Sequence, residues 1–123
     1  MRILLSIKPE FALKIFEGSK KYEYRRIIFK RDKVKRVVVY ASAPIGKVIG
    51  EFEIGDILHD EPESLWTKTM DYAGISEERF FNYFSNVAKG YAIKVINYKM
   101  YGTPVPLDNF MVSSPPQSFM YLE

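Results

Sequence analysis

The segment Ile3-Leu-Leu-Ser-Ile-Lys-Pro-Glu-Phe-Ala-Leu-Lys-Ile-Phe-Glu-Gly18 contains a strand, a helix and a helix stop, and Ser-Lys-Lys-Tyr-Glu-Tyr-Arg25 follows it directly. The apolar run over residues 1–7 predicts a buried strand that ends before Pro9. Proline suits the first position of a helix, and apolar residues then recur at helical spacing. Gly18 is placed to end that helix. The alternation after it predicts a second strand over residues 22–29.

The rest of the chain indicates strands with helices grouped between them. Further strands are predicted over residues 37–41, 47–58 and 90–101, with Gly50 and Gly55 marking bulges or bends in the long second one. Helices are predicted over residues 61–72 and after the capping residue Ser76. Residues 103–107 hold two prolines, so this segment is predicted to be extended but poorly suited to a central strand, and the tail 113–123 is assigned no element. About five strands and three helices predict an α+β fold, with a small mixed β-barrel flanked by helices.

Length and composition set bounds on the class of protein. The 123 residues fit one domain spanning 1–123. With no cysteine and one histidine, His59, we expect no metal site built on those residues, and no cofactor is predicted. The sequence holds no run of about 18 apolar residues, so we expect no membrane partner, and Lys8 and Pro9 interrupt any leader-like segment. These features favour a cytoplasmic protein.

The net charge of +3 conceals an asymmetry along the chain. Residues 1–36 hold 12 basic and 4 acidic residues, a balance of +8, whereas the remaining 87 hold 6 basic and 11 acidic residues, a balance of −5. Such a split predicts a polyanionic partner at the basic end. The densest run comprises Lys30, Arg31, Lys33, Lys35 and Arg36. A solvated loop with no partner remains the alternative for this run.

The stretch Gly18-Ser19-Lys20-Lys21-Tyr22-Glu23-Tyr24-Arg25 has the pattern Gly-x-Lys-x-x-Glu-x-Arg. With the preceding Leu5-Ser-Ile-Lys-Pro9 and two later stretches, it resembles the ASCH family of the PUA-like superfamily. The later stretches are Tyr83-Phe84 followed by Ala88-Lys-Gly-Tyr-Ala-Ile93, and Pro115-Pro-Gln-Ser-Phe119. The resemblance implies a PUA-like barrel with a cleft lined by the motif, and roles that include RNA binding, hydrolysis of modified nucleosides and regulation.

The motif itself predicts a charged binding site. Glu23 and Arg25 lie two apart on a strand and point to one face, and Lys20 in the preceding turn can project over a cleft mouth beside them. Arginine offers a planar fork for phosphate or for a base edge, and lysine offers a mobile positive charge. These three side chains suit a nucleotide. The alternative is an internal ion pair in which Glu23 only neutralises its neighbours.

Other polar and aromatic residues are candidates for the same cleft. Ser6 and Lys8 close the first strand and Ser42 follows the third, while Gln117 and Ser118 come after a double proline. Tyr40 is a candidate for stacking on a base, as are the tyrosines 22, 24 and 91, although strand tyrosines more often belong to the core. His59, beside two carboxylates, is interpreted as a solvated residue.

Three functional hypotheses follow. The first is a module that binds RNA, another nucleic acid or a nucleotide. The second rests on the resemblance, because ASCH-like proteins include amidohydrolases that deacylate a modified cytidine with a Lys and a Thr of the motif and a further carboxylate. Lys20 matches that lysine, but Glu23 occupies the threonine position, and Asp71 is only a weak candidate for the carboxylate. Glu23 would then act as a general base towards water. The third is a regulatory protein-interaction domain using the acidic stretch 51–63.

Overall fold

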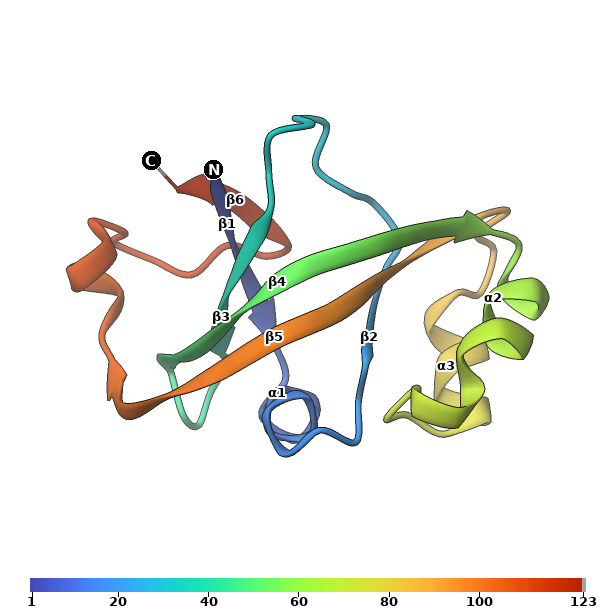
Figure 1. Ribbon diagram of the computed structural model, residues 1–123, viewed down its shortest axis with the longest axis horizontal. Coiled ribbons are helices and arrows are strands. Elements are labelled where there is room, and N and C mark those ends of the chain that lie inside the picture. The colour runs from blue at the N-terminus through green and yellow to red at the C-terminus, as the bar shows by residue number, and fades with distance from the viewer. Residues whose placement is uncertain (123) are drawn as a thin grey trace.

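The structure, a computed structural model, describes residues 1–122 as one curved six-stranded sheet with three α-helices and two 3-10 helices (Figure 1). In chain order the elements are β1 (Arg2–Ile7), α1 (Pro9–Glu17), β2 (Tyr22–Arg25), β3 (Arg36–Ala41), β4 (Lys47–Asp60), α2 (Pro62–Thr69), η1 (Met70–Tyr72), α3 (Glu77–Tyr83), β5 (Gly90–Val105), η2 (Leu107–Phe110) and β6 (Phe119–Leu122). The predicted α+β class is confirmed.

The sheet has the order β2-β5-β4-β3-β1-β6, with β1 and β3 parallel and every other pair antiparallel. β2 pairs only with β5, and β6 pairs only with β1, so the two edges remain apart. The expectation of a closed barrel of about five strands is therefore corrected to an open sheet of six. The sixth strand was missed because its four residues follow a proline-rich tail and are too few to show a clear alternation.

Local sequence explains most of the element boundaries. Pro9 starts α1, and Gly18 ends it in the left-handed conformation at φ 92°. Ser76 caps α3, its hydroxyl accepting a hydrogen bond from the Arg79 amide at 3.2 Å. The predicted strand over residues 22–29 is wrong beyond Arg25, because Ile28 and Phe29 leave the ladder and pack into the core.

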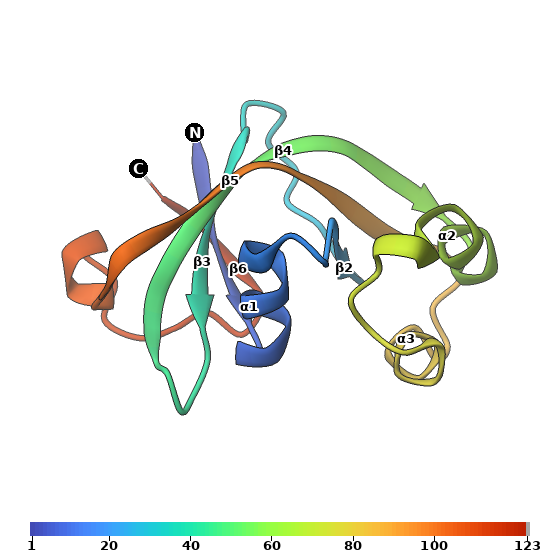
Figure 2. The same cartoon turned by 60° about the horizontal axis from the view of Figure 1, so that its bottom comes forward.

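The long antiparallel pair β4 and β5 gives the sheet its curvature (Figure 2). Its register shifts three times, between Val48 and Gly50, between Glu51 and Glu53, and between Ile54 and Ile57. The first and third shifts lie at the two strand glycines, as predicted. A Cβ atom on Gly50 would lie 2.5 Å from the Lys99 carbonyl oxygen and 2.6 Å from Cζ of Phe16, so only glycine allows this close crossing. The bent pair arches over α1, and α2 and α3 lie in the connection between its two strands (Figure 2).

The core lies on both faces of the sheet. On the concave face, Ala12 and Ile15 of α1 pack with Val37, Val39 and Phe52. The opposite face is covered near η2 by a second cluster, and α2 and α3 enclose a third cluster around Phe80. Strands β1 and β3 contribute to two of these clusters, so both strands are buried on both faces.

Candidate functional site

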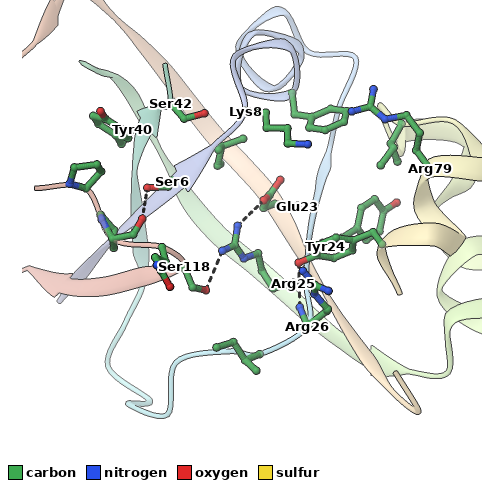
Figure 3. A pocket seen from close by; sticks show the side chains of 18 of the residues that line it. Ser6, Lys8, Glu23, Tyr24, Arg25, Arg26, Tyr40, Ser42, Arg79 and Ser118 are labelled. Carbon is green, nitrogen blue, oxygen red and sulfur yellow. Dashed lines mark hydrogen bonds and ion pairs between the residues drawn. The ribbon is translucent and has the colours of Figure 1, made fainter. Parts of the chain in front are cut away.

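A cavity of about 1360 Å³ lies at the opening between the two sheet edges. One wall is β2, another is the end of β1, a third is the segment 115–118 that leads into β6, and α3 closes the remaining side (Figure 3). Five basic side chains and one carboxylate line it: Lys8, Lys20, Arg25, Arg26, Arg79 and Glu23. The cavity is therefore strongly cationic, and the open sheet creates it.

The predicted convergence of the motif residues is present in the structure. Arg25 Nη1 lies 3.2 Å from the Glu23 carboxylate, and Glu23 is 6% exposed. Both side chains line the cavity together with Lys20. The internal ion pair and the open cavity thus coexist, since one face of the pair is packed and the other borders the cavity.

Lys20 departs from its expected position over the cleft mouth. Its side chain is 3% exposed and lies between the rings of Phe11 and Tyr24, with Nζ 5.4 Å and 4.7 Å from their centroids. The ammonium donates a hydrogen bond to the Ala73 carbonyl at 2.8 Å. Burial lowers the pKa of Lys20 to about 8, although the nearby Glu23 carboxylate opposes the shift.

Gly74, which follows Ala73, allows the backbone of its loop to lie close to the Lys20 side chain. It has φ +66°, and a Cβ atom there would lie 2.5 Å from the Lys20 Cβ and 2.7 Å from its Cγ. A glycine is required both by the backbone conformation and by the contact. The loop between η1 and α3 therefore positions the lysine, a role that local sequence reasoning around the motif did not find.

Arg25 also joins the two open edges of the sheet. Its Nη2 donates to the Ser118 hydroxyl at 2.9 Å, while the Ser6 hydroxyl donates to the Pro116 carbonyl at 2.6 Å (Figure 3). The Ser6 amide also donates to the Ser118 carbonyl at 3.4 Å. These contacts hold the proline-rich tail as a wall of the cavity.

The structure brings together most of the residues that the sequence singled out. The following candidates line the cavity: Ser6, Lys8, Lys20, Glu23, Arg25, Tyr40, Ser42, Gln117 and Ser118. Asp71 is exposed and does not line it, so the further carboxylate of the amidohydrolase hypothesis has no counterpart there. His59 and Tyr91 are also outside, stacked on each other with centroids 4.1 Å apart.

The basic run lies beside the cavity, outside its lining. Lys30, Arg31, Lys33 and Lys35 are exposed in the connection between β2 and β3. Arg36 differs, because it belongs to β3 and lies 3.3 Å from Glu51 and 3.5 Å from Glu53.

Several lining residues escaped the sequence analysis. Arg79, Asn82 and Tyr83 come from α3, and Phe11 comes from α1. Arg79 contacts the Phe11 ring at 4.8 Å and pairs with Glu10 at 3.1 Å. Arg79 and Glu10 are 69 positions apart in the sequence, so no local pattern reveals their contact. Arg26 also lines the cavity, and it belongs to the basic residues 1–36, but the sequence analysis did not assign it to the site.

Two further properties concern metal and membrane. Within residues 1–122, the structure gathers no three His, Asp or Glu side chains in an arrangement that could hold a metal ion. No helix of this described part combines the length and apolar character needed to cross a bilayer.

The family model named ASCH domain matches residues 5–99, so the chain belongs to the ASCH domain family. Among solved structures, the ASCH protein of Zymomonas mobilis superposes with a TM-score of 0.90 at 29% identity, covering 99% of this chain and 87% of that one. The expected PUA-like fold is thereby confirmed.

Curated relatives include proteins of quite different names. An ASCH domain-containing ribonuclease of Zymomonas mobilis is 31% identical over 126 residues, which cover 97% of this chain and 82% of the relative. Two Ureaplasma parvum proteins, named large ribosomal subunit protein uL22 and ATP synthase subunit alpha, are 28% and 27% identical. The chain spans only 39% and 15% of their lengths.

Proposed function

We propose that this ASCH domain binds RNA and that the cavity holds one nucleotide of the strand. The observation that carries the proposal is the cationic cavity itself, which is lined by five basic side chains and a single carboxylate, with only Arg79 paired to an acid outside the lining, Glu10. Anionic ligands are favoured there, and the volume of about 1360 Å³ exceeds what a nucleotide-sized molecule needs. A relative named as a ribonuclease, 31% identical to this chain, supports the same class of ligand.

Within the cavity the polar groups divide into two sets. Arg25 is fixed by Glu23 and Ser118, so its guanidinium is oriented before a ligand arrives. With Lys8 at the exposed start of α1, it suits a phosphate. Ser42 and Gln117 line the cavity beside the largely buried Tyr40 and offer hydrogen-bonding groups to the edge of a base.

The exposed basic run contributes at longer range. Lys30, Arg31, Lys33 and Lys35 raise the local concentration of a polyanion near the cavity mouth. Arg36 contributes less, since Glu51 and Glu53 offset its charge. Affinity for RNA should therefore fall as salt concentration rises.

Binding of short RNA and of nucleoside monophosphates tests the proposal. We expect Arg25→Gln to weaken binding of both ligands by about tenfold or more, because a charge-assisted contact to phosphate is lost. Lys94→Gln, on the exposed surface of β5 and outside the cavity, is the matched control and should change little. Wild-type protein that binds neither ligand at low salt would refute the proposal.

Hydrolysis in the same cavity is a second candidate, favoured by one observation. Lys20, with its pKa lowered to about 8, and the Glu23 carboxylate share the cavity wall. Glu23 could accept the proton of an attacking hydroxyl while the cations stabilise the developing negative charge. The Glu23–Arg25 ion pair competes with that role, so binding remains the primary proposal.

The hydrolytic candidate is tested by incubating the protein with single-stranded RNA and with N4-acetylcytidine. Cleavage of RNA would assign a nuclease, and release of cytidine would assign an amidohydrolase. Glu23→Gln should abolish whichever activity is found. Undiminished turnover in this variant would rule out Glu23 as the base.

A further inference from the structure

Residues 26–35, which we call the basic arm, connect β2 to β3 and are held in place by their apolar side chains. Ile28, Phe29 and Val34 pack into the main core cluster. The backbone is tied at the far end as well, where the Lys35 amide donates to the Met1 carbonyl at 3.1 Å and its carbonyl accepts from Ile54 at 2.9 Å. The basic arm is thus an ordered surface feature.

The positive charges of the basic arm face the solvent. Arg26, Lys30, Arg31, Lys33 and Lys35 are all exposed, against the single carboxylate of Asp32. Within residues 1–122 none of these five has an acidic partner within salt-bridge distance, whereas Arg36 just beyond has two. Exposed cations without ion-pair partners, on a segment that begins at a cationic cavity, attract a polyanion.

An arginine stacked on a tyrosine stands near each end of the basic arm. Arg26 Cζ lies 4.6 Å above the ring centroid of Tyr83 in α3, and Arg31 Cζ lies 4.3 Å above that of Tyr121 in β6. Each tyrosine hydroxyl also accepts a backbone hydrogen bond from the arm, from Arg26 at 3.2 Å and from Lys30 at 3.0 Å. The same device therefore fixes the arm to α3 and to β6.

These stacks suit unpaired bases. A guanidinium resting with one face on an aromatic ring can present its other face to a base, and Arg26 and Arg31 are both exposed. Arg26 and Ile27 of the arm also line the cavity, and the Ile27 side chain is 60% exposed. The arm therefore begins at the cavity with an exposed apolar residue. Bases inside a duplex are already stacked and cannot use such platforms, whereas those of a single strand can.

We propose that the basic arm is a second binding site, which takes the nucleotides flanking the one in the cavity and makes single-stranded RNA the ligand. The phosphates run along Lys30, Lys33 and Lys35, and bases stack on Arg26 and Arg31. This inference rests on the proposed function of the cavity for its starting point. Its own evidence is the paired Arg–Tyr stacks and the unpaired charges.

The first test removes the charge of the basic arm. The variant replaces Lys30, Arg31, Lys33 and Lys35 by glutamine, and the matched control replaces Lys47, Lys89, Lys94 and Lys99, four exposed lysines outside the cavity lining. Fluorescence anisotropy over a salt series measures the affinity for an oligouridylate of about ten nucleotides and for an RNA duplex. Calorimetry measures the binding of uridine monophosphate.

The arm variant should lose about 100-fold affinity for the single strand at low salt. The magnitude of its log–log salt slope should fall by about 2, at roughly 0.7 per phosphate contact for the three lysine contacts. The control should stay within a few-fold of wild type. Binding of uridine monophosphate should be unchanged in both. Wild-type protein should prefer the single strand to the duplex. Equal loss in arm variant and control, or a preference for duplex, would overturn the inference.

A second test separates stacking from charge. Arg31→Lys keeps the positive charge but removes the planar group over Tyr121, whereas Arg36→Lys makes the same change at a paired arginine. We expect about a tenfold loss for the single strand with Arg31→Lys, an unaltered salt slope, and almost no change with Arg36→Lys. Equal affinities for the two variants would show that Arg31 is not a stacking platform.

The two proposals can fail separately. If arm variants weaken oligonucleotide binding while uridine monophosphate does not bind and Arg25→Gln has no effect, the cavity proposal fails and the arm proposal stands. If the cavity variants alone matter, the arm proposal fails. If wild-type protein binds no oligonucleotide at any salt concentration, both fail.

Discussion

The cavity motif and the basic arm carry the same sign of charge in opposite physical settings. In the motif, Lys20 and Arg25 are fixed by hydrogen bonds at low exposure, beside a buried carboxylate. In the basic arm, charges such as Lys33 and Lys35 lie in solvent and only the backbone and the apolar residues are fixed. The contribution of a buried charge depends on the geometry of its partners, whereas each exposed charge contributes little and several must act together. The motif should therefore govern stability and ligand choice, and the arm should govern attraction.

The largest expected effect tests this contrast on two ion pairs. Arg25→Met leaves the Glu23 carboxylate buried without its guanidinium, so we expect a loss of about 3 kcal/mol in the free energy of unfolding. Arg36→Met breaks the more exposed pairs with Glu51 and Glu53 and should cost less than about 1 kcal/mol. Urea denaturation of both variants measures the difference. Equal costs would contradict the distinction between the two settings.

The second effect concerns the loop that holds the buried lysine. Gly74→Ala places a methyl group against Lys20 and forces a non-glycine residue to φ +66°. We therefore expect a loss of about 2 kcal/mol in the free energy of unfolding, and weaker ligand binding. Gly102→Ala is the control, because a Cβ atom there meets no atom within 4 Å. Thermal unfolding of the pair checks the prediction. A Gly74→Ala protein as stable as the Gly102→Ala protein would mean that Lys20 can move aside freely.

The third effect is a pH dependence that belongs to the motif alone. Burial lowers the pKa of Lys20 to about 8 from an ordinary 10.5. Between these values the unfolded chain holds a proton that the folded chain has released, so stability rises as pH rises through this window. Relative to Lys20→Met, the free energy of unfolding of the wild type should rise by about 2 kcal/mol between pH 8 and roughly pH 10. Tyr24, whose pKa burial raises to about 12, opposes this only at higher pH.

Lys20→Met also tests whether the lysine is kept for function. The change removes the desolvation cost of the buried ammonium but leaves the Ala73 carbonyl without its donor, so the two effects should largely cancel and the free energy of unfolding at pH 7 should change by less than about 2 kcal/mol. Parallel pH profiles for the two proteins would show that Lys20 does not titrate in the expected window.

The sequence could predict that the three motif side chains lie side by side, because they are close together in the chain. Lys20, Glu23 and Arg25 span six positions, and the alternation of a strand places the last two on one face. Proline and glycine at the ends of α1 set its boundaries. Local rules were sufficient wherever the physical cause was local.

Features that depend on distant segments were not readable in the same way. The burial of Lys20 is caused by Ala73 and Gly74, more than fifty positions away, and α3 supplies Arg79 and Tyr83 to the cavity through tertiary packing. The openness of the sheet depends on β2 ending at Arg25, which happens because Ile28 and Phe29 find better burial in the core than in the ladder. Residue preferences at those positions favoured a longer strand, and tertiary packing overrode them.

The smallest expected effect is the one that best isolates the basic arm. Lys33→Gln removes an exposed cation that has no ion-pair partner within the described residues, so the free energy of unfolding should change by less than about 0.5 kcal/mol. Any change should be a slight gain in stability at low salt, because Lys33 is repelled by Arg31 and Lys35, and this gain should vanish as salt screens the arm. Denaturation at low and high salt measures both quantities. A clear loss of stability would mean that Lys33 makes a structural contact, and the separation of duties between motif and arm would then no longer hold.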